Sequence, residues 1–284
     1  MHVENPSKNL VWLASYPKSG NTWFRSFLTV LLKNQQIDLN KMATDGIFSG
    51  KNFVENILDV HADYLTERQI ELYQRLAFTY LSETSSKKLY IKIHDAFTFS
   101  ELDKLPLIPE APSACAVYFV RNPLDVTLSL ANHIGKPLDF TIEKYMVNPK
   151  SGFVGKRSSS NDQFHQPLGT WSMHVESWLT KPLFPVHFMR YEDMKEKPFE
   201  TFKAAVQAMG LSVSEEEIQF ALEETRFEKL QEKEQKGGFR EKPSVHRSFF
   251  FKGEVGRWKQ ELTAEQIEKI SHANEPMMRH FGYL

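Results

Sequence analysis

The residues YPKSGNTW at positions 16–23 decide how the rest of the chain is interpreted. The apolar run at 10–15 comes directly before them and predicts a short buried strand. Apolar residues at helical spacing over 24–31 predict a helix directly after them. A strand, a tight turn and a helix in this order leave free backbone N–H groups at the helix start, where the helix dipole also favours an anion.

Three side chains in the turn add to this preference for an anion. Lys18 supplies a cation, and the hydroxyls of Ser19 and Thr22 supply hydrogen-bond donors. The turn differs from the nucleotide-binding P-loop, G-x-x-x-x-G-K-[ST], because Lys18 precedes Gly20 and no glycine stands five residues before it. The sequence therefore predicts a phosphate site of another kind, although an ordinary helix N-cap beside a lysine fits the turn equally well when it is taken alone.

Composition narrows the class of protein. The 284 residues are enough for one large core, and we expect a single domain over residues 1–284. The net charge of −1 argues against general binding to nucleic acid. Cys115 is the only cysteine, which excludes an intrachain disulfide and a cysteine-based metal cluster. Because the N-terminal residues lack a signal peptide's apolar region and no apolar run is long enough to span a bilayer, we expect a cytoplasmic protein.

Strands and helices alternate along the chain. Apolar runs predict further strands at 89–94, 114–120 and 185–192. Helical spacing and capping residues predict helices at 23–32, 66–83, 123–133, 171–180, 199–209, 214–224 and 263–280. This alternation predicts an α/β fold in three layers around a central parallel sheet, with a P-loop-like strand, turn and helix at its start.

Two segments show poor periodicity. The segment 135–169 contains a polar, serine-rich stretch, and we expect a flexible loop or lid there. The segment 231–248 is highly charged and contains two adjacent glycines, and we expect it to be mobile. Both are candidates for covering a binding site.

Polar residues collect at the ends of the four predicted strands. Lys18 follows the first strand, His94 ends the second, Arg121 the third and Tyr191 the fourth. Because ligands bind beyond the carboxyl ends of the strands in parallel sheets, these four residues are expected to share one crevice. Strand alternation also places Lys92 on the same face as His94.

At these positions the chain resembles the sulfotransferases that use 3′-phosphoadenosine 5′-phosphosulfate (PAPS), and their cytosolic-type branch in particular. Residues 16–23 are similar to the family's 5′-phosphosulfate loop, and residues 121–129 to its 3′-phosphate motif, R-N-P-x-D-x-x-x-S. Residues 92–94 resemble the K-x-H of the catalytic base, residues 190–195 the Y-E-D-M strand end, and residues 250–259 the segment R-K-G-x-x-G-D-W-K. The five motifs keep the family's order and cover most of the chain.

The resemblance implies an enzyme that moves a sulfuryl group from PAPS to a hydroxyl of a small-molecule acceptor, leaving adenosine 3′,5′-bisphosphate (PAP). It implies that His94 takes the proton from that hydroxyl, a task that suits histidine. Lys18 would stabilise charge on the leaving phosphate oxygen, and Lys92 would contact the sulfuryl group. No metal is implied, because lysine and arginine neutralise the charge.

The resemblance also implies the residues that hold the co-substrate. Backbone amides of the loop would bind the 5′-phosphate, and Arg121 with Ser129 the 3′-phosphate. Trp23 and Phe227 would stack on adenine, while Tyr191 and Thr225 would contact its edge. The full predicted set is Lys18, Ser19, Gly20, Asn21, Thr22, Trp23, Arg121, Ser129, Tyr191, Thr225, Phe227, Phe250, Lys252 and Gly253.

The chain departs from the family at one phosphate ligand. Phe251 stands where the family usually has an arginine that binds the 3′-phosphate. Arg247 or Arg257 would have to replace that cation, and Lys252 remains beside it. Residues 259–268 are similar to the family's dimer segment and imply a homodimer, although a helix start with a capping box explains them equally well.

Several residues and functions remain open at this point. Asp95 either orients His94 or lies in a solvated turn, and we favour the turn. Three further histidines are predicted to be non-catalytic, namely His133, His165 and His174. The acceptor is a phenol, sterol, lipid alcohol, sugar or natural-product hydroxyl. The alternatives to sulfuryl transfer are a P-loop small-molecule kinase, which would need magnesium and ATP, and a non-catalytic PAP-binding regulatory protein.

Overall fold

Four parallel strands form the centre of the molecule. The computed structural model describes residues 8–155, 162–242, 249–250 and 253–284. The strands are β1 (Leu10–Ser15), β2 (Leu89–Ile93), β3 (Ser113–Val120) and β6 (Val186–Arg190), paired in the order β2-β1-β3-β6. All three pairings are parallel, so the four carboxyl ends meet at one edge of the sheet. The predicted central parallel sheet is therefore confirmed.

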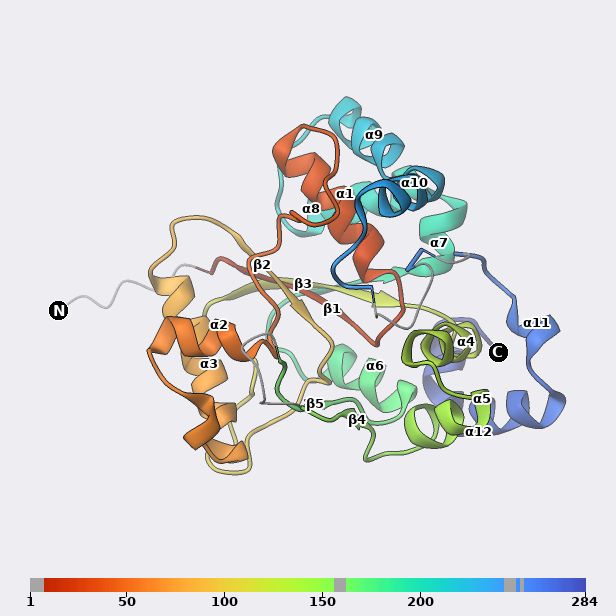
Figure 1. The fold of residues 1–284 in the computed structure, drawn as a ribbon, viewed down its shortest axis with the longest axis horizontal. Coiled ribbons are helices and arrows are strands. Elements are labelled where there is room, and N and C mark those ends of the chain that lie inside the picture. The colour runs from red at the N-terminus through yellow and green to blue at the C-terminus, as the bar shows by residue number, and fades with distance from the viewer. Residues whose placement is uncertain (1–7, 156–161, 243–248, 251–252) are drawn as a thin grey trace.

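Helices cover both faces of this sheet (Figure 1). One face carries α1 (Asn21–Lys33), α7 (Tyr191–Glu196), α8 (Pro198–Ala208), α9 (Glu215–Glu224) and α10 (Phe227–Gly237). The other face carries α2 (Lys51–Leu58), α3 (Glu67–Glu83), α4 (Pro123–Ile134), α6 (Trp171–Thr180) and α12 (Ala264–His280). The short element η1 (Ala62–Tyr64) lies between α2 and α3, and α11 (Trp258–Glu261) comes directly before α12.

The predicted helix starts are accurate because capping side chains fix them. Thr66, Ser214 and Thr263 each accept a hydrogen bond from the backbone N–H three residues later. In each case the glutamine or glutamate at that later position bonds back to the backbone of the cap, which completes a capping box. The helices α3, α9 and α12 therefore begin where the sequence predicts.

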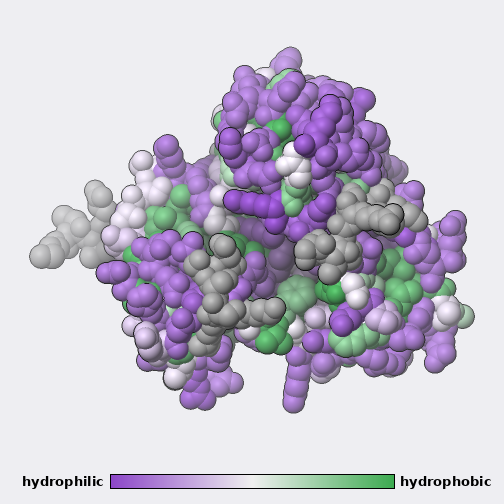
Figure 2. Space-filling model, viewed as in Figure 1, coloured by the Kyte–Doolittle hydropathy of each residue, from purple (hydrophilic) through white to green (hydrophobic). Residues whose placement is uncertain are grey.

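Between the two helical layers the surface is hollowed. Figure 2 shows this hollow between the helices around α1 and α10 and the elements on the opposite face of the sheet. Its lining includes residues from the carboxyl ends of the strands and mixes polar with apolar side chains. The fold therefore places a cleft where parallel sheets ordinarily bind ligands.

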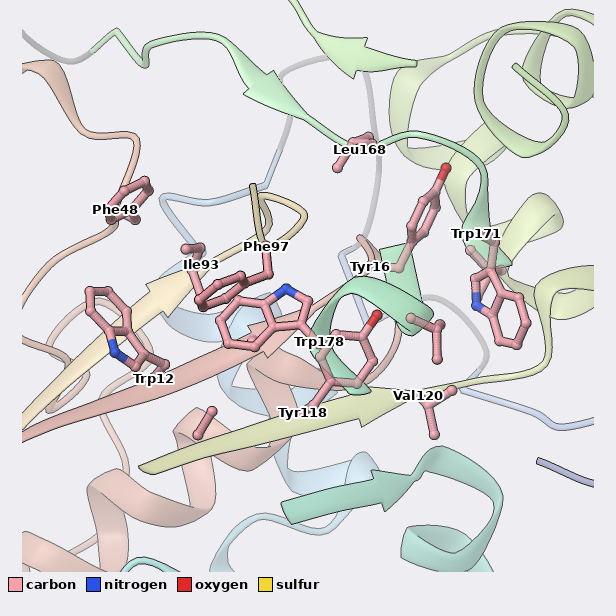
Figure 3. Packing of buried hydrophobic residues seen from close by; sticks show 14 of the residues in the cluster. Trp12, Tyr16, Phe48, Ile93, Phe97, Tyr118, Val120, Leu168, Trp171 and Trp178 are labelled. Carbon is pink, nitrogen blue, oxygen red and sulfur yellow. The ribbon is translucent and has the colours of Figure 1, made fainter. Parts of the chain in front are cut away.

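Alternate side chains along the strands pack into two separate hydrophobic cores, one on each face of the sheet. On β1, Trp12 and Ala14 belong to one core, whereas Val11 and Leu13 belong to the other. Figure 3 shows the first core, where Trp12, Tyr118 and Trp178 lie among the buried side chains of the sheet and α6. Burial on both faces explains why the strands read as continuous apolar runs in the sequence.

The segment 135–169, for which a flexible loop or lid was predicted, carries regular secondary structure over part of its length. The segment contains α5 (Leu138–Thr141), the π-helical turn η2 (Ile142–Met146) and a small antiparallel pair of strands, β4 (Gly152–Phe153) and β5 (Gln166–Pro167). Met146 and Leu168 are fully buried in the first core (Figure 3 labels Leu168). A π-turn and two-residue strands carry neither a 3.6-residue nor a two-residue period, so the pattern gave no sign of them. Residues 156–161 lie outside the described part of the chain.

The segment 231–248, for which mobility was predicted, belongs to α10 as far as Gly237. The carboxylate of Glu234 is buried and accepts hydrogen bonds from the backbone N–H groups of Phe249 and Phe250, at 2.6 and 3.0 Å. The highly charged composition of this segment therefore hid a helix, and the Glu234 carboxylate of that helix binds the backbone at Phe249 and Phe250. Residues 243–248 lie outside the described part of the chain.

Candidate active site

The four strand-end residues line a single cleft of about 1870 Å³. Lys18, His94, Arg121 and Tyr191 come from the ends of four different strands and face this space together. The structure thus brings together the residues that the sequence placed at one crevice. Among the other predicted site residues, Gly20, Asn21, Thr22, Trp23, Lys92, Ser129, Phe227, Phe250 and Gly253 also line it.

The turn before α1 is shaped by a glycine that no other residue replaces easily. Gly20 has φ of +106°, and a Cβ atom there would lie 2.8 Å from Cδ2 of Tyr191. Asn21 does not face outward, because its Nδ2 donates to the carbonyl oxygen of Leu13 at 2.8 Å. The side chain of Asn21 therefore braces the turn against β1, and the turn can offer an anion its backbone.

Ser19 behaves differently from its predicted role. The residue is fully buried, and its hydroxyl has no hydrogen-bond partner among the residues that the structure describes. Its backbone N–H remains part of the helix start, where the dipole favours an anion. The hydroxyl lies beneath the surface of the turn.

Lys18 is held in a low-dielectric, cationic environment. Its Nζ lies 4.2 Å from the centre of the Phe249 ring. Burial of the ammonium group, and then the nearby charges of Lys92 and Arg121, lower the pKa of Lys18 to about 8. A buried lysine next to two other cations is stabilised by an incoming anion, because the anion restores the favourable interactions that burial removes.

Arg121 joins the phosphate turn to the C-terminal segment. Its guanidinium group lies 4.2 Å from the centre of the Tyr191 ring and donates to the carbonyl oxygens of Lys18 and Glu254, at 3.3 and 2.9 Å. The Nε atom of Arg121 is buried and has no partner within the described ranges. Ser129, two turns along α4, lines the cleft on the same side.

The C-terminal segment is fixed by a carboxylate on α4. Asp125 is buried and accepts hydrogen bonds from the backbone N–H groups of Gly256 and Trp258, at 2.7 and 3.2 Å. The hydroxyl of Tyr191 donates to the carbonyl oxygen of Gly253 at 2.9 Å. The segment therefore crosses the cleft close to Arg121.

One of the two predicted replacements for the phosphate-binding arginine, Arg257, lines the cleft. Arg257 forms ion pairs with Glu254, at 3.6 Å, and with Glu261. The other candidate, Arg247, lies outside the described residues, as do Phe251 and Lys252.

On the side predicted for adenine, Trp23 and Phe227 share a cation. The Nζ atom of Lys195 lies 5.7 Å from the Trp23 ring and 5.5 Å from the Phe227 ring. Thr225 is fully buried, and its hydroxyl donates to the carbonyl oxygen of Ala221 at 2.7 Å. The structure therefore brings Trp23 and Phe227 to the cleft but leaves Thr225 in the core, contrary to the prediction. A threonine at a helix end often bonds back to the preceding turn in this way.

His94 has one ring nitrogen fixed and the other directed to the cleft. Its Nδ1 lies 3.0 Å from the carbonyl oxygen and 3.2 Å from the hydroxyl of Ser15. Because a carbonyl only accepts, Nδ1 carries the proton and Nε2 keeps a lone pair. Burial of the ring, and then the charge of Lys92, lower the pKa of His94 well below 6.5, so the ring is neutral at neutral pH.

Two buried residues lie close to His94, and the predicted environment is wrong for Asp95 only. His174 is fully buried; its Nε2 lies 2.9 Å from the carbonyl oxygen of His94, and its Nδ1 lies 2.8 Å from the hydroxyl of Tyr118. It supports the backbone of His94. Asp95 is buried rather than solvated, and burial raises the pKa of its carboxyl well above the usual value. Ser15, not Asp95, orients the His94 ring.

Two charged residues in the cleft were missed. Glu241 accepts hydrogen bonds from both terminal nitrogens of Arg25, at 3.1 and 2.7 Å, and from Nζ of Lys92 at 3.1 Å. Arg25 lies on the cleft side of α1, where the helical pattern alone gave it no role. Glu241 is far from both in sequence, so no local signal connected the three charges.

Neither a metal site nor a membrane span is found in the part of the chain that the structure describes. No group of three or more His, Cys, Asp or Glu residues there is arranged to hold a metal ion. None of the helices in those ranges has the length and apolar character needed to cross a bilayer.

Comparison with known proteins places this cleft in a family. The model of the sulfotransferase domain matches residues 8–282. The chain belongs to the sulfotransferase domain family. It is a PAPS-dependent transferase of sulfuryl groups, as the sequence predicts, and PAP is the nucleotide product.

Relatives and solved structures agree with this assignment. The flavonol 3-sulfotransferase of Flaveria bidentis is 28% identical over 279 residues, which cover 92% of this chain and 79% of that protein. Cytosolic sulfotransferase 10 of Arabidopsis thaliana is 24% identical over 290 residues, which cover 98% and 80% of the two chains. The crystal structure of mouse sulfotransferase SULT7A1 complexed with PAP has the same fold, with a TM-score of 0.60, 21% identity and coverage of 96% and 85%.

Proposed function

We propose that this sulfotransferase passes the sulfuryl group of PAPS to a hydroxyl of a small-molecule acceptor, with His94 as the general base. The observation that carries the proposal is the state of His94. Its Nδ1 is bonded to Ser15, its lowered pKa keeps the ring neutral, and Nε2 is left for a proton. Lys18 and Lys92 line the same cleft and supply the positive charge that PAPS, an anionic sulfuryl donor, requires.

The proposed nucleotide site has two phosphate positions. The backbone at the start of α1 and the ammonium group of Lys18 would hold the 5′-phosphate. Arg121 and Ser129 would hold the 3′-phosphate, with the unpartnered Nε of Arg121 available to it. Adenine would lie between Trp23 and Phe227, where the described structure has the Lys195 ammonium group.

The proposed reaction is an in-line displacement at sulfur. The acceptor oxygen attacks as His94 Nε2 takes its proton, and a new S–O bond forms while the bond from sulfur to the 5′-phosphate oxygen breaks. That oxygen leaves with the bonding electron pair on PAP. Lys18 stabilises the charge that develops there, and Lys92 the sulfuryl oxygens.

The acceptor side of the cleft mixes apolar and polar residues. Phe53 and Phe153 line it together with Asn52 and Gln166. Gln166 is buried, and its Oε1 lacks a partner among the described residues. This mixture supports an acceptor with an apolar body and at least one further hydrogen-bonding group, which fits phenolic and natural-product hydroxyls better than a plain lipid alcohol.

Three further expectations remain part of the proposal. A cytoplasmic location is supported by the relative called a cytosolic sulfotransferase. A homodimer through residues 259–268 is supported only by the resemblance of that segment, since the capping box of Thr263 explains its sequence as well. We also treat the whole chain as one domain, because the family match spans residues 8–282.

The test is PAP formation from PAPS with a panel of phenols, sterols, sugars and natural-product alcohols. Replacement His94→Ala is expected to lower the rate about 10²- to 10⁴-fold, as for loss of a general base. Lys18→Ala is expected to lower it about 10²- to 10³-fold, as for loss of one charge-stabilising group. His280→Ala, an exposed histidine at the end of α12, is the matched control and should leave the rate unchanged.

Three results would count against the proposal. Full activity of His94→Ala and Lys18→Ala would remove the residue roles. Tight PAP binding without turnover of any acceptor would favour the non-catalytic regulatory protein. Magnesium-dependent ATP binding would favour the kinase.

A further inference from the structure

We propose that Glu241 is a positioning residue that holds the Lys92 ammonium group until the sulfuryl group of PAPS replaces the Glu241 carboxylate as its anionic partner. Glu241 would thereby weaken the binding of PAPS relative to the binding of PAP. The inference rests on the proposed role of Lys92 at the sulfuryl group. Its basis is the ion-pair cluster of Arg25, Lys92 and Glu241 inside the cleft.

The geometry makes Glu241 the anion that Lys92 faces. The Nζ atom of Lys92 lies 3.1 Å from Oε2 of Glu241. Arg25 grips the same carboxylate with two nitrogens, at 2.7 Å to Oε1 and 3.1 Å to Oε2. A carboxylate held by a fork of this kind keeps its position even if Lys92 turns away, because two strong hydrogen bonds to Arg25 remain.

The three residues differ in how they are anchored. Arg25 lies in α1, which directly follows β1 and its turn, and Lys92 lies in β2 of the central sheet. Glu241 lies in the segment after α10, which is held by the buried ring of Phe239 and by a hydrogen bond from the Arg240 backbone to Asn40. The anion is therefore supplied across the cleft by a segment outside the sheet.

The ion-pair cluster is largely enclosed. The Arg25 side chain is 4% exposed and that of Lys92 16%. Burial raises the pKa of Glu241, but the charges of Lys92 and Arg25 outweigh it and hold that pKa far below the usual value. Glu241 therefore remains a carboxylate, and it occupies the position beside Lys92 that an anionic sulfuryl oxygen would need.

This arrangement distinguishes the two nucleotides. PAPS brings a negative sulfuryl group to Lys92 and must compete with Glu241 for it, and the two anions repel each other. PAP lacks the sulfuryl group, so it leaves the pair between Lys92 and Glu241 intact. After transfer, Lys92 pairs with Glu241 again. Glu241 therefore brings the affinity for PAPS closer to the affinity for PAP than it would be without this carboxylate.

The test is calorimetric titration of the full chain with PAP and with PAPS in the absence of acceptor. In Glu241→Gln, PAPS affinity is expected to rise about tenfold relative to PAP affinity, while PAP affinity changes less than about twofold. Glu232→Gln, which removes an exposed carboxylate in the middle of α10, is the matched control and should leave the ratio unchanged.

The outcomes separate this inference from the proposed function. An unchanged ratio in Glu241→Gln, or equal changes for both nucleotides, would overturn it. Failure of the unaltered protein to bind either nucleotide would overturn the proposed function instead. Because Glu241→Gln leaves Arg25 buried and unpaired, the double variant Arg25→Met with Glu241→Gln should be measured too. The same rise in the ratio is expected there, and its absence would again contradict the inference.

Discussion

The Nδ1 atom of His94 lies 3.0 Å from the carbonyl oxygen of Ser15, on the neighbouring strand β1. The contact joins the ends of two paired strands, so the ring is oriented by the backbone of the sheet rather than by another titrating side chain. A carboxylate in that position would raise the pKa of the ring, whereas a carbonyl provides orientation with much less charge. Burial and Lys92 then keep the ring neutral.

The first prediction concerns the acid side of the pH profile. Since the pKa of His94 is lowered well below 6.5, the base stays unprotonated as the pH falls through 6.5. With saturating PAPS, kcat/KM for the acceptor should therefore be flat from about pH 7.5 to 6.5 and decline only below that range. Initial rates across this range check it. Loss of half the activity at or above pH 6.5 would show an unshifted histidine.

The second prediction concerns Lys18, whose pKa is about 8 in the protein without nucleotide. The ammonium form is the one that binds an anion, so PAP affinity should fall as the pH rises above about 8, by at most about tenfold per pH unit. Titrations of PAP at pH 7 to 9.5 measure this. Lys18→Arg should remove the decline, because arginine keeps its charge. Parallel curves for the two proteins would refute the assignment.

The third prediction concerns the turn before α1. Gly20→Ala places a Cβ atom 2.8 Å from the Tyr191 ring at a φ of +106°, and should lower the free energy of unfolding by about 1–3 kcal/mol. It should also weaken PAP binding, because Tyr191 supports Arg121. The matched variant is Gly237→Ala in α10, which has free space around the added methyl group. That change should stabilise the protein by about 0.5–1 kcal/mol. Urea denaturation measures both; a neutral Gly20→Ala would show that the turn relaxes.

The fourth prediction concerns stability in acid. The folded-state pKa of His174 is lowered to about 4 by burial. Between pH 6.5 and 4 the unfolded chain therefore binds a proton that the folded chain does not, and stability falls as the pH falls. The loss attributable to His174 is about 3 kcal/mol over that range. Urea denaturation at pH 4.5 to 7 should show a shallower decline for His174→Gln than for the unaltered protein. Equal slopes would show that His174 is not the titrating group.

The strands and most helices could be predicted because their signals are local. The strands β1, β2 and β3 are buried on both faces, and Thr66, Ser214 and Thr263 mark three helix starts by their own side chains. The convergence of Lys18, His94 and Arg121 followed from one rule about parallel sheets.

The remaining features depend on contacts between distant residues. Glu241 meets Lys92 across 149 positions, and His174 meets His94 across 80. Thr225 matched a family position, but its hydroxyl donates to the carbonyl oxygen of Ala221 in the preceding turn and lies in the core. The segment at 135–169 was misjudged because its short, irregular elements are defined by the core that they pack against, which no local pattern records.

The bonds from Asp125 to Gly256 and Trp258 have a consequence for how the enzyme is made. The ribosome makes the N-terminus first, so all four strands of the sheet have been synthesised by residue 190, while the segment that Asp125 binds is still unsynthesised. A nascent chain therefore contains the strands of the sheet and the phosphate turn before it contains the segment 254–258, which Arg121 and Asp125 bind. Nucleotide capture at a completed site therefore requires that the segment up to Trp258 has left the ribosome.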